Sequence, residues 1–122
     1  MNYTTEDLAI EVMRLPNWIG AQETPDAADA AYIRNVYGDL YKEWKLRGIA
    51  YWADVEAIPQ EVFRHIVRII VDSVAPSFGD AAPTEFDIET GVQMSMGKKG
   101  WNGLKRVTGR QSSGLPAQAQ YF

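Results

Sequence analysis

The chain has 122 residues, 46% of them hydrophobic, and a formal net charge of −4 at pH 7. This length can bury one modest core but not two, so we expect a single domain. The absence of cysteine excludes disulfides, thiolate metal sites and a cysteine nucleophile. No apolar run reaches the length of a membrane span, and the amino-terminal residues MNYTTEDLAIEVMRL carry acids where a signal peptide carries bases. We therefore expect a soluble protein made in the cytoplasm.

Two helices are predicted in the first 48 residues. Thr4 or Thr5 can cap the first helix, and Pro16 ends it. The second runs through TPDAADAAYIRNVYGDLYKEWKLRG, with Thr24 as its cap, Pro25 at its first position and Gly48 as a left-handed stop. Its apolar residues recur at three- and four-residue steps, which predicts one face turned to a core: Ile33, Val36, Tyr37, Leu40 and Trp44.

A third helix is predicted from Pro59 to Pro76. It is apolar over more than half of its circumference, which indicates a central helix covered on several sides. Trp44 and Trp52 are expected in the same core. The apolar positions of this helix are Val62, Phe63, Ile66, Val67, Ile69, Ile70, Val71 and Val74.

The last helix is predicted between Thr84 and about residue 108. Ile88, Val92 and Met96 can share one side of it, but four glycines at 91, 97, 100 and 103 disfavour a straight helix. We therefore expect a kink or interruption around GKKGWNG. The expected fold is all-α, a small bundle of about four helices over residues 1–108, followed by an extended carboxy-terminal arm over residues 109–122.

The charge is distributed unevenly along the chain. Residues 1–89 carry all 16 acidic residues, whereas residues 90–122 carry five basic residues and no acid. Such a basic end can contact an acidic partner, another copy of the chain or nucleic acid, or it can lie against the acidic body of its own chain. The candidate residues for a subunit or nucleic-acid contact are Lys98, Lys99, Trp101, Lys105 and Arg106.

No catalytic pattern stands out. His65 is the only histidine, and its helical surroundings favour a half-exposed structural residue. The acidic pairs Glu6/Asp7, Asp26/Asp29 and Asp87/Glu89 lie near expected helix starts, where acids stabilise the helix dipole. No phosphate loop, zinc spacing or nucleophile elbow is present, so we expect no enzyme activity, metal or cofactor.

The stretch LYKEWKLRGIAYWADVEAIPQEVFRHIVRIIVDSVAPSFG and the terminal LPAQAQYF carry a family resemblance. Together they resemble the small head-to-tail adaptor (connector) proteins of tailed bacteriophages, including the tail accessory factor of short-tailed phages. The resemblance rests on the EW…G pattern, the IP helix start, the apolar helix ending in APSFG and the aromatic tail, and covers about residues 29–122. The glycine-rich fourth helix departs from the family pattern, which is rich in Ala, Arg and Leu.

The resemblance implies a virion protein at the head–tail interface, assembled in the host cytoplasm. Such proteins form a ring, typically of about twelve copies, which binds the portal protein and a downstream tail protein and extends the channel for DNA. DNA would pass without sequence-specific binding, and no membrane is involved. Their carboxy-terminal arms grip the portal, which here implies contacts by Arg110, Leu115, Pro116, Tyr121 and Phe122, with the two aromatics as anchors. The alternative function is a small helical nucleic-acid-binding protein that uses the basic carboxy-terminal region.

Overall fold

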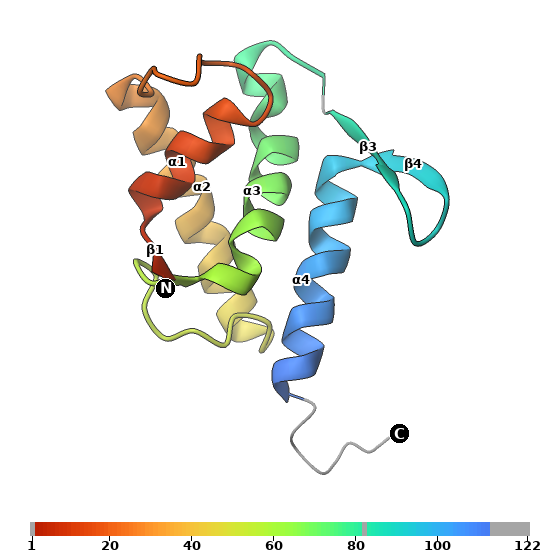
Figure 1. Ribbon diagram of the computed structural model, residues 1–122. Helices are drawn as coiled ribbons and strands as arrows, with labels where there is room; N and C mark the ends of the chain where they lie inside the picture. Colours follow the sequence, from red (N-terminus) through yellow and green to blue (C-terminus); the bar gives the residue numbers. More distant parts are fainter. Residues whose placement is uncertain (1, 82, 113–122) are drawn as a thin grey trace.

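The computed structural model describes residues 2–81 and 83–112. One helix, α3, packs against the three others: α1 and α2 lie on one side of it and α4 on the other (Figure 1). A short 3₁₀ helix, η1, continues from the end of α3. The helices are α1 (Thr5–Arg14), α2 (Ala27–Leu46), α3 (Gln60–Val74), η1 (Ala75–Phe78) and α4 (Met96–Ser112).

Two small antiparallel sheets accompany the helices. The first pairs β1 (Asn2–Tyr3) with β2 (Ile58–Pro59), and the second is a hairpin of β3 (Thr84–Asp87) and β4 (Val92–Ser95). The hairpin extends sideways from the start of α4 (Figure 1). The fold is therefore mixed, and the prediction of an all-α bundle is wrong.

The hairpin replaces the beginning of the predicted last helix. The Asp87 carboxylate accepts hydrogen bonds from the backbone N–H of Thr90 at 3.2 Å and from its hydroxyl at 2.8 Å. Gly91 donates its N–H to the Asp87 carbonyl at 2.8 Å and adopts φ 74°, the left-handed region that favours glycine. A side-chain-supported turn thus reverses the chain where the apolar spacing of the sequence predicts helix.

The first three helices confirm most of their sequence predictions. Thr4 caps α1 through a reciprocal capping box with Asp7, with bonds of 3.2 and 3.0 Å. Gly48 has φ 73° after α2, as the predicted left-handed stop requires. The start of α2 was placed too early: Asp26, rather than Thr24, precedes its first turn, and its carbonyl accepts the N–H of Ala30 at 2.9 Å.

The core forms around α3, as predicted. Val62, Ile66, Ile70, Val71 and Val74 of this helix have no exposed surface. Both predicted core tryptophans, Trp44 and Trp52, are buried. The Trp52 indole N–H donates to the Tyr37 hydroxyl at 3.1 Å, and the Tyr41 hydroxyl donates to the Trp52 carbonyl at 2.7 Å. The polar atoms of these aromatic side chains are thus paired inside the core.

The fourth helix is continuous from Met96 to Ser112, so the predicted kink around GKKGWNG is wrong. Its glycines lie where α4 crosses α3. A β-carbon on Gly100 would lie 2.5 Å from the His65 carbonyl oxygen, and one on Gly97 or Gly103 would collide with the side chain of Asp72 or His65. Close packing with α3 therefore accounts for glycines that reduce the intrinsic stability of the helix.

Candidate interaction surface

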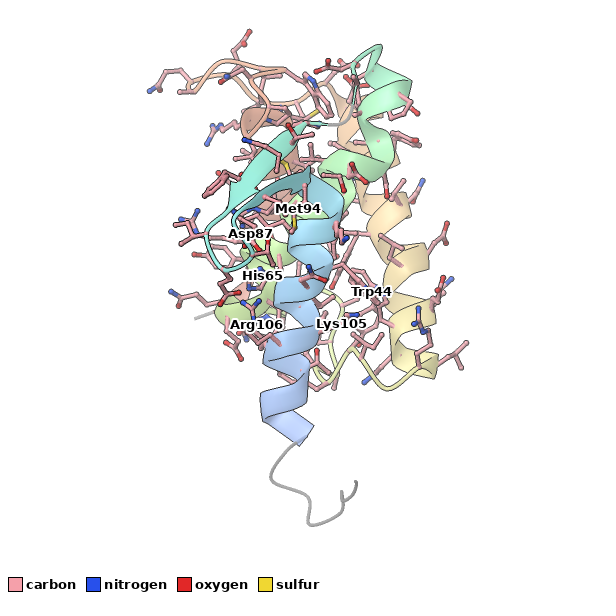
Figure 2. All side chains as sticks on the ribbon, turned by 90° about the vertical axis from the view of Figure 1, so that its right-hand side faces the viewer. Trp44, His65, Asp87, Met94, Lys105 and Arg106 are labelled. Carbon is pink, nitrogen blue, oxygen red and sulfur yellow. The ribbon has the colours of Figure 1, made fainter. Side chains whose placement is uncertain are left out.

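Four basic residues of α4 whose side chains the structure describes lie on two different sides of the helix. Lys99 and Arg106 are seven positions apart and face the hairpin, whereas Lys98 and Lys105 form a separate stripe. Figure 2 shows Arg106 near His65 and Asp87, and Lys105 on the side of α4 toward Trp44. The five candidate contact residues from the sequence thus fall into two environments.

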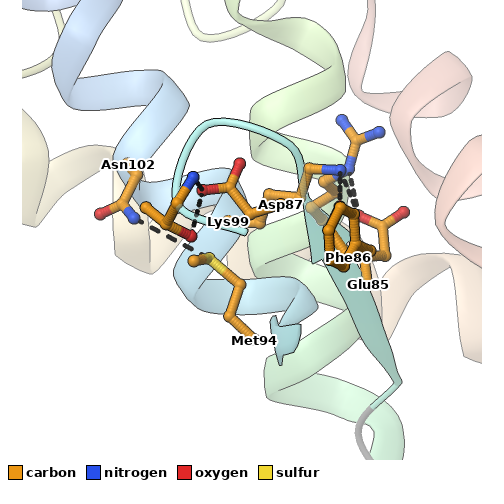
Figure 3. Close-up of polar contacts among 8 residues, drawn as sticks. Glu85, Phe86, Asp87, Met94, Lys99 and Asn102 are labelled. Atoms are coloured by element: carbon orange, nitrogen blue, oxygen red, sulfur yellow. Dashed lines mark hydrogen bonds and ion pairs between the residues drawn. The ribbon is translucent and has the colours of Figure 1, made fainter. Parts of the chain in front are cut away.

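On the hairpin side, the bases are paired with acids of the same chain. Arg68 of α3 binds the Glu85 carboxylate at 2.9 Å, and the Lys99 ammonium lies 3.6 Å from the same carboxylate. Lys99 also donates to the Phe86 carbonyl at 3.3 Å (Figure 3). Arg106 binds Glu89 at 2.6 Å. For these two basic residues of α4, the structure thus shows the alternative in which the basic end lies against acids of its own chain.

His65 lies on the same side, beside a cavity of about 110 Å³. Burial lowers the pKa of His65, and the charges of Arg68 and Arg106 lower it further. The neutral imidazole is therefore favoured in the folded protein. The ring is also the group that a side chain at Gly103 would displace. Both observations agree with the structural role expected from the sequence.

The other side of α4 presents a cationic and aromatic surface, here called the Trp101 surface: Arg47, Lys98, Trp101 and Lys105. The Arg47 guanidinium lies 5.5 Å and the Lys105 ammonium 5.7 Å from the centre of the Trp101 ring. Trp101 also packs near Trp44, with ring centres 6.3 Å apart. Lys98 and Lys105 are exposed, and within residues 2–81 and 83–112 no ion pair involves either of them.

The hairpin exposes apolar side chains. Phe86 is 51%, Ile88 87% and Val92 52% exposed. Because Glu85, Lys99 and Arg106 hold the hairpin against the helices, these apolar side chains occupy a defined position. The register pairs Phe86 with Gln93 and Val92 with Asp87, so Phe86 and Val92 lie on opposite faces of the hairpin, with Ile88 at its tip between them. A projecting tip with exposed apolar side chains is a candidate contact with another protein.

A groove of about 490 Å³ runs between α1 and α3. Its apolar part comes from Tyr3 and Phe63, whose rings stack with centres 4.1 Å apart, together with Ile10, Leu15 and Val67. Its charged lining residues are Asp7, Glu11, Arg14, Arg64 and Arg68. Within the described part of the chain, the buried Nε atom of Arg14 has no hydrogen-bond partner.

The predicted arm contacts lie largely outside the described residues. Arg110 falls within α4, which continues to Ser112, but its side chain is not described. Leu115, Pro116, Tyr121 and Phe122 lie beyond residue 112 and so outside the described part of the chain. Their proposed contact with a portal protein stays a prediction.

The acidic pairs occupy structural positions, but not all at helix starts. Glu6 and Asp7 lie in the first turn of α1, and Asp29 lies in that of α2. Asp87 and Glu89 lie instead in the hairpin, where Asp87 stabilises the turn and Glu89 pairs with Arg106. In the described residues no group of three His, Cys, Asp or Glu side chains could hold a metal ion, and no helix is long and apolar enough to span a bilayer.

Comparisons with known proteins identify no relative of this chain. No family model matches the chain, and neither the curated proteins nor the solved structures contain a match.

Proposed function

We propose that this chain is a structural protein of a tailed-phage virion, a head-to-tail adaptor that assembles as a ring under the portal. The ring extends the DNA channel toward the tail, and the carboxy-terminal segment attaches each subunit to the portal. The sequence resemblance over residues 29–122 motivates the proposal. The observation that supports it best is the hairpin, which projects from the helices with three exposed apolar side chains that a partner surface could cover.

The helical body also suits such a subunit. Its core is closed around α3, so the domain can fold before assembly. The surfaces left for partners differ from one another: an apolar hairpin, the groove between α1 and α3, and the Trp101 surface. Head-to-tail assembly of identical subunits joins unlike surfaces in this way.

The test of portal attachment is a pull-down with purified portal rings. Residues 1–112 alone and the double variant Tyr121→Ala/Phe122→Ala are each compared with the full chain. We expect both to lose most portal binding, because truncating a buried aromatic anchor commonly costs about 2 kcal/mol or more and a ring multiplies the loss through avidity. Thermal melts should show that the helical body is unchanged. Full portal binding by residues 1–112 would contradict the proposal.

A second candidate function is supported by the Trp101 surface. Exposed cations around a half-buried tryptophan suit contacts with the backbone and bases of nucleic acid. If binding DNA were the main function, affinity would fall steeply between about 50 and about 200 mM salt, whereas docking through aromatic anchors would change little. Fluorescence anisotropy with labelled DNA distinguishes the two, with Lys98→Glu/Lys105→Glu as the test variant and Arg34→Glu/Lys42→Glu on α2 as its matched control.

A further inference from the structure

We propose that the β3–β4 hairpin of one copy docks into the groove between α1 and α3 of the next copy. The inference rests on the ring-forming part of the proposed function and names the surfaces through which neighbouring subunits meet. Three observations support it: the apolar tip of the hairpin, the size and apolar lining of the groove, and the charges on both surfaces.

The hairpin is shaped to insert into another surface. Ile88 lies in the turn between the strands and is 87% exposed, and Phe86 and Val92 flank it on opposite faces of the hairpin, so only insertion of the whole tip would cover all three. The turn is fastened by the bonds from Thr90 to Asp87 and by the ion pair of Glu89 with Arg106, and strand β3 by the ion pairs of Glu85 with α3 and α4. A preorganised apolar projection loses little conformational entropy when it binds.

The groove offers matching chemistry. Its floor is apolar, with Phe63 and Val67 beneath the partly exposed Ile10 and Leu15. Its volume of about 490 Å³ falls within the range of pockets that enclose small ligands, so it can accept the few side chains of a hairpin tip.

The charges also match. Three arginines and two acids line the groove, whereas Ile88 is flanked by the carboxylates Asp87 and Glu89. In the described part of the chain, Arg64 has no ion pair and Arg14 is bonded only through its NH2 group, to the Glu23 carbonyl at 3.3 Å. Within their own chain, Thr90 holds one oxygen of Asp87 and Arg106 holds one oxygen of Glu89. The exposed Arg64 of the next copy is placed to meet the second oxygens of these carboxylates, whereas the free Nε of Arg14 is buried and is not available to a partner.

The docking has to join two molecules. Lys99 and Arg106 tie the hairpin to α4, and Glu85 of the hairpin binds Arg68, which also lines the groove. The apolar side chains Phe86, Ile88 and Val92, however, are not among the residues that line the groove of their own chain. The contact therefore pairs unlike surfaces of successive copies. Such heterologous contacts close into rings when the rotation between copies permits, and otherwise continue as filaments.

Disulfide cross-linking tests this contact, because the natural chain has no cysteine to interfere. In the double variant Leu15→Cys/Ile88→Cys, one cysteine lies in the groove and the other at the hairpin tip. Mild oxidation at high protein concentration should produce a ladder of covalent multimers from this variant. The matched control Asn35→Cys/Ile88→Cys, whose second cysteine is on an exposed position of α2, should not. Equal multimer yields from the two variants, or none from either, would overturn the proposal.

Charge reversal in the groove provides an independent measurement. Arg64→Glu in the Leu15→Cys/Ile88→Cys background should reduce the yield of multimers several-fold, whereas Arg34→Glu on α2 should leave it unchanged. Because Arg64 and Arg34 are both exposed, circular dichroism should show that both variants remain folded. An undiminished ladder with Arg64→Glu would contradict the charge match.

The portal pull-down separates this inference from the proposed function. A cross-linked ladder from a chain that does not bind portal would support the hairpin contact and contradict the adaptor proposal. Portal binding by the full chain, together with equal multimer yields from the two cysteine pairs, would support the adaptor proposal and contradict the hairpin contact.

Discussion

At the scale of single residues, burial on α3 decides which substitutions the protein tolerates. Ile70→Ala should destabilise the fold by about 2–5 kcal/mol, because the side chain has no exposed surface and its removal leaves a cavity. Ile88→Ala removes the same atoms from a side chain that is 87% exposed and should have little effect. Chemical denaturation of both variants measures the difference. Equal losses would mean that the hairpin tip belongs to the core.

His65 makes stability depend on pH. Its pKa in the fold is lowered from the ordinary 6.5, so the unfolded chain binds a proton more readily between the lowered value and 6.5. Stability should therefore fall as the pH drops through that window, and His65→Gln should flatten this part of the profile. Thermal melts across the pH range test this. The pKa values of Glu61 and Asp87 are also lowered. Their contributions to stability are lost only at lower pH, as the pH falls below their ordinary pKa values of 4.5 and 3.8.

At the scale of elements, the crossing of α3 and α4 depends on glycine. Gly100→Ala should destabilise the protein by about 1–3 kcal/mol, because the new methyl group would meet the His65 backbone carbonyl and the Arg68 β-carbon. Gly38→Ala on α2 meets nothing within 4 Å and should stabilise it by about 1 kcal/mol through helix propensity. Thermal melts of the pair provide the comparison. A higher melting temperature for both variants would show that α3 and α4 separate to accommodate the methyl group at position 100.

The hairpin is the element for which sequence patterns were least informative. Ile88, Val92 and Met96 recur every four residues, which fits one face of a helix but is also a multiple of the two-residue period of a strand. Gly91 and the bonds between Thr90 and Asp87 favour a turn over a helix. The DIETG segment thus contained the turn signal, which the helical spacing around it obscured.

At the scale of the whole molecule, the isolated chain should be a folded monomer or a weak oligomer that becomes a ring only on its partner. The core closes without a second chain, and the apolar part of the proposed contact comes from three hairpin side chains, whereas stable complexes typically bury about 1,600 Å² in total. Size exclusion with light scattering at micromolar concentration measures the mass. A stable ring of about a dozen copies without portal would contradict this expectation.

The candidate surface was predicted only in part. The sequence identified the basic residues of the last helix, but it could not divide them between two environments. Lys99 and Arg106 meet Glu85 and Glu89 because the hairpin folds back along α4, whereas Lys105 lies beside Trp101 on the other side. The groove had no sequence signal at all, because α1 and α3 are separated by more than 40 residues of chain.

The sequence by itself determined the first three helices and the core around α3. Caps, stop residues and apolar spacing act between residues a few positions apart, so their effect can be predicted without knowing the neighbours. Only the tertiary structure decided the form of residues 84–112. Glycine weakens an isolated helix, yet at positions 97, 100 and 103 it allows α4 to approach α3 closely enough for packing to offset that loss. Whether a glycine breaks or supports a helix depends on what lies against it, and that depends on the rest of the fold.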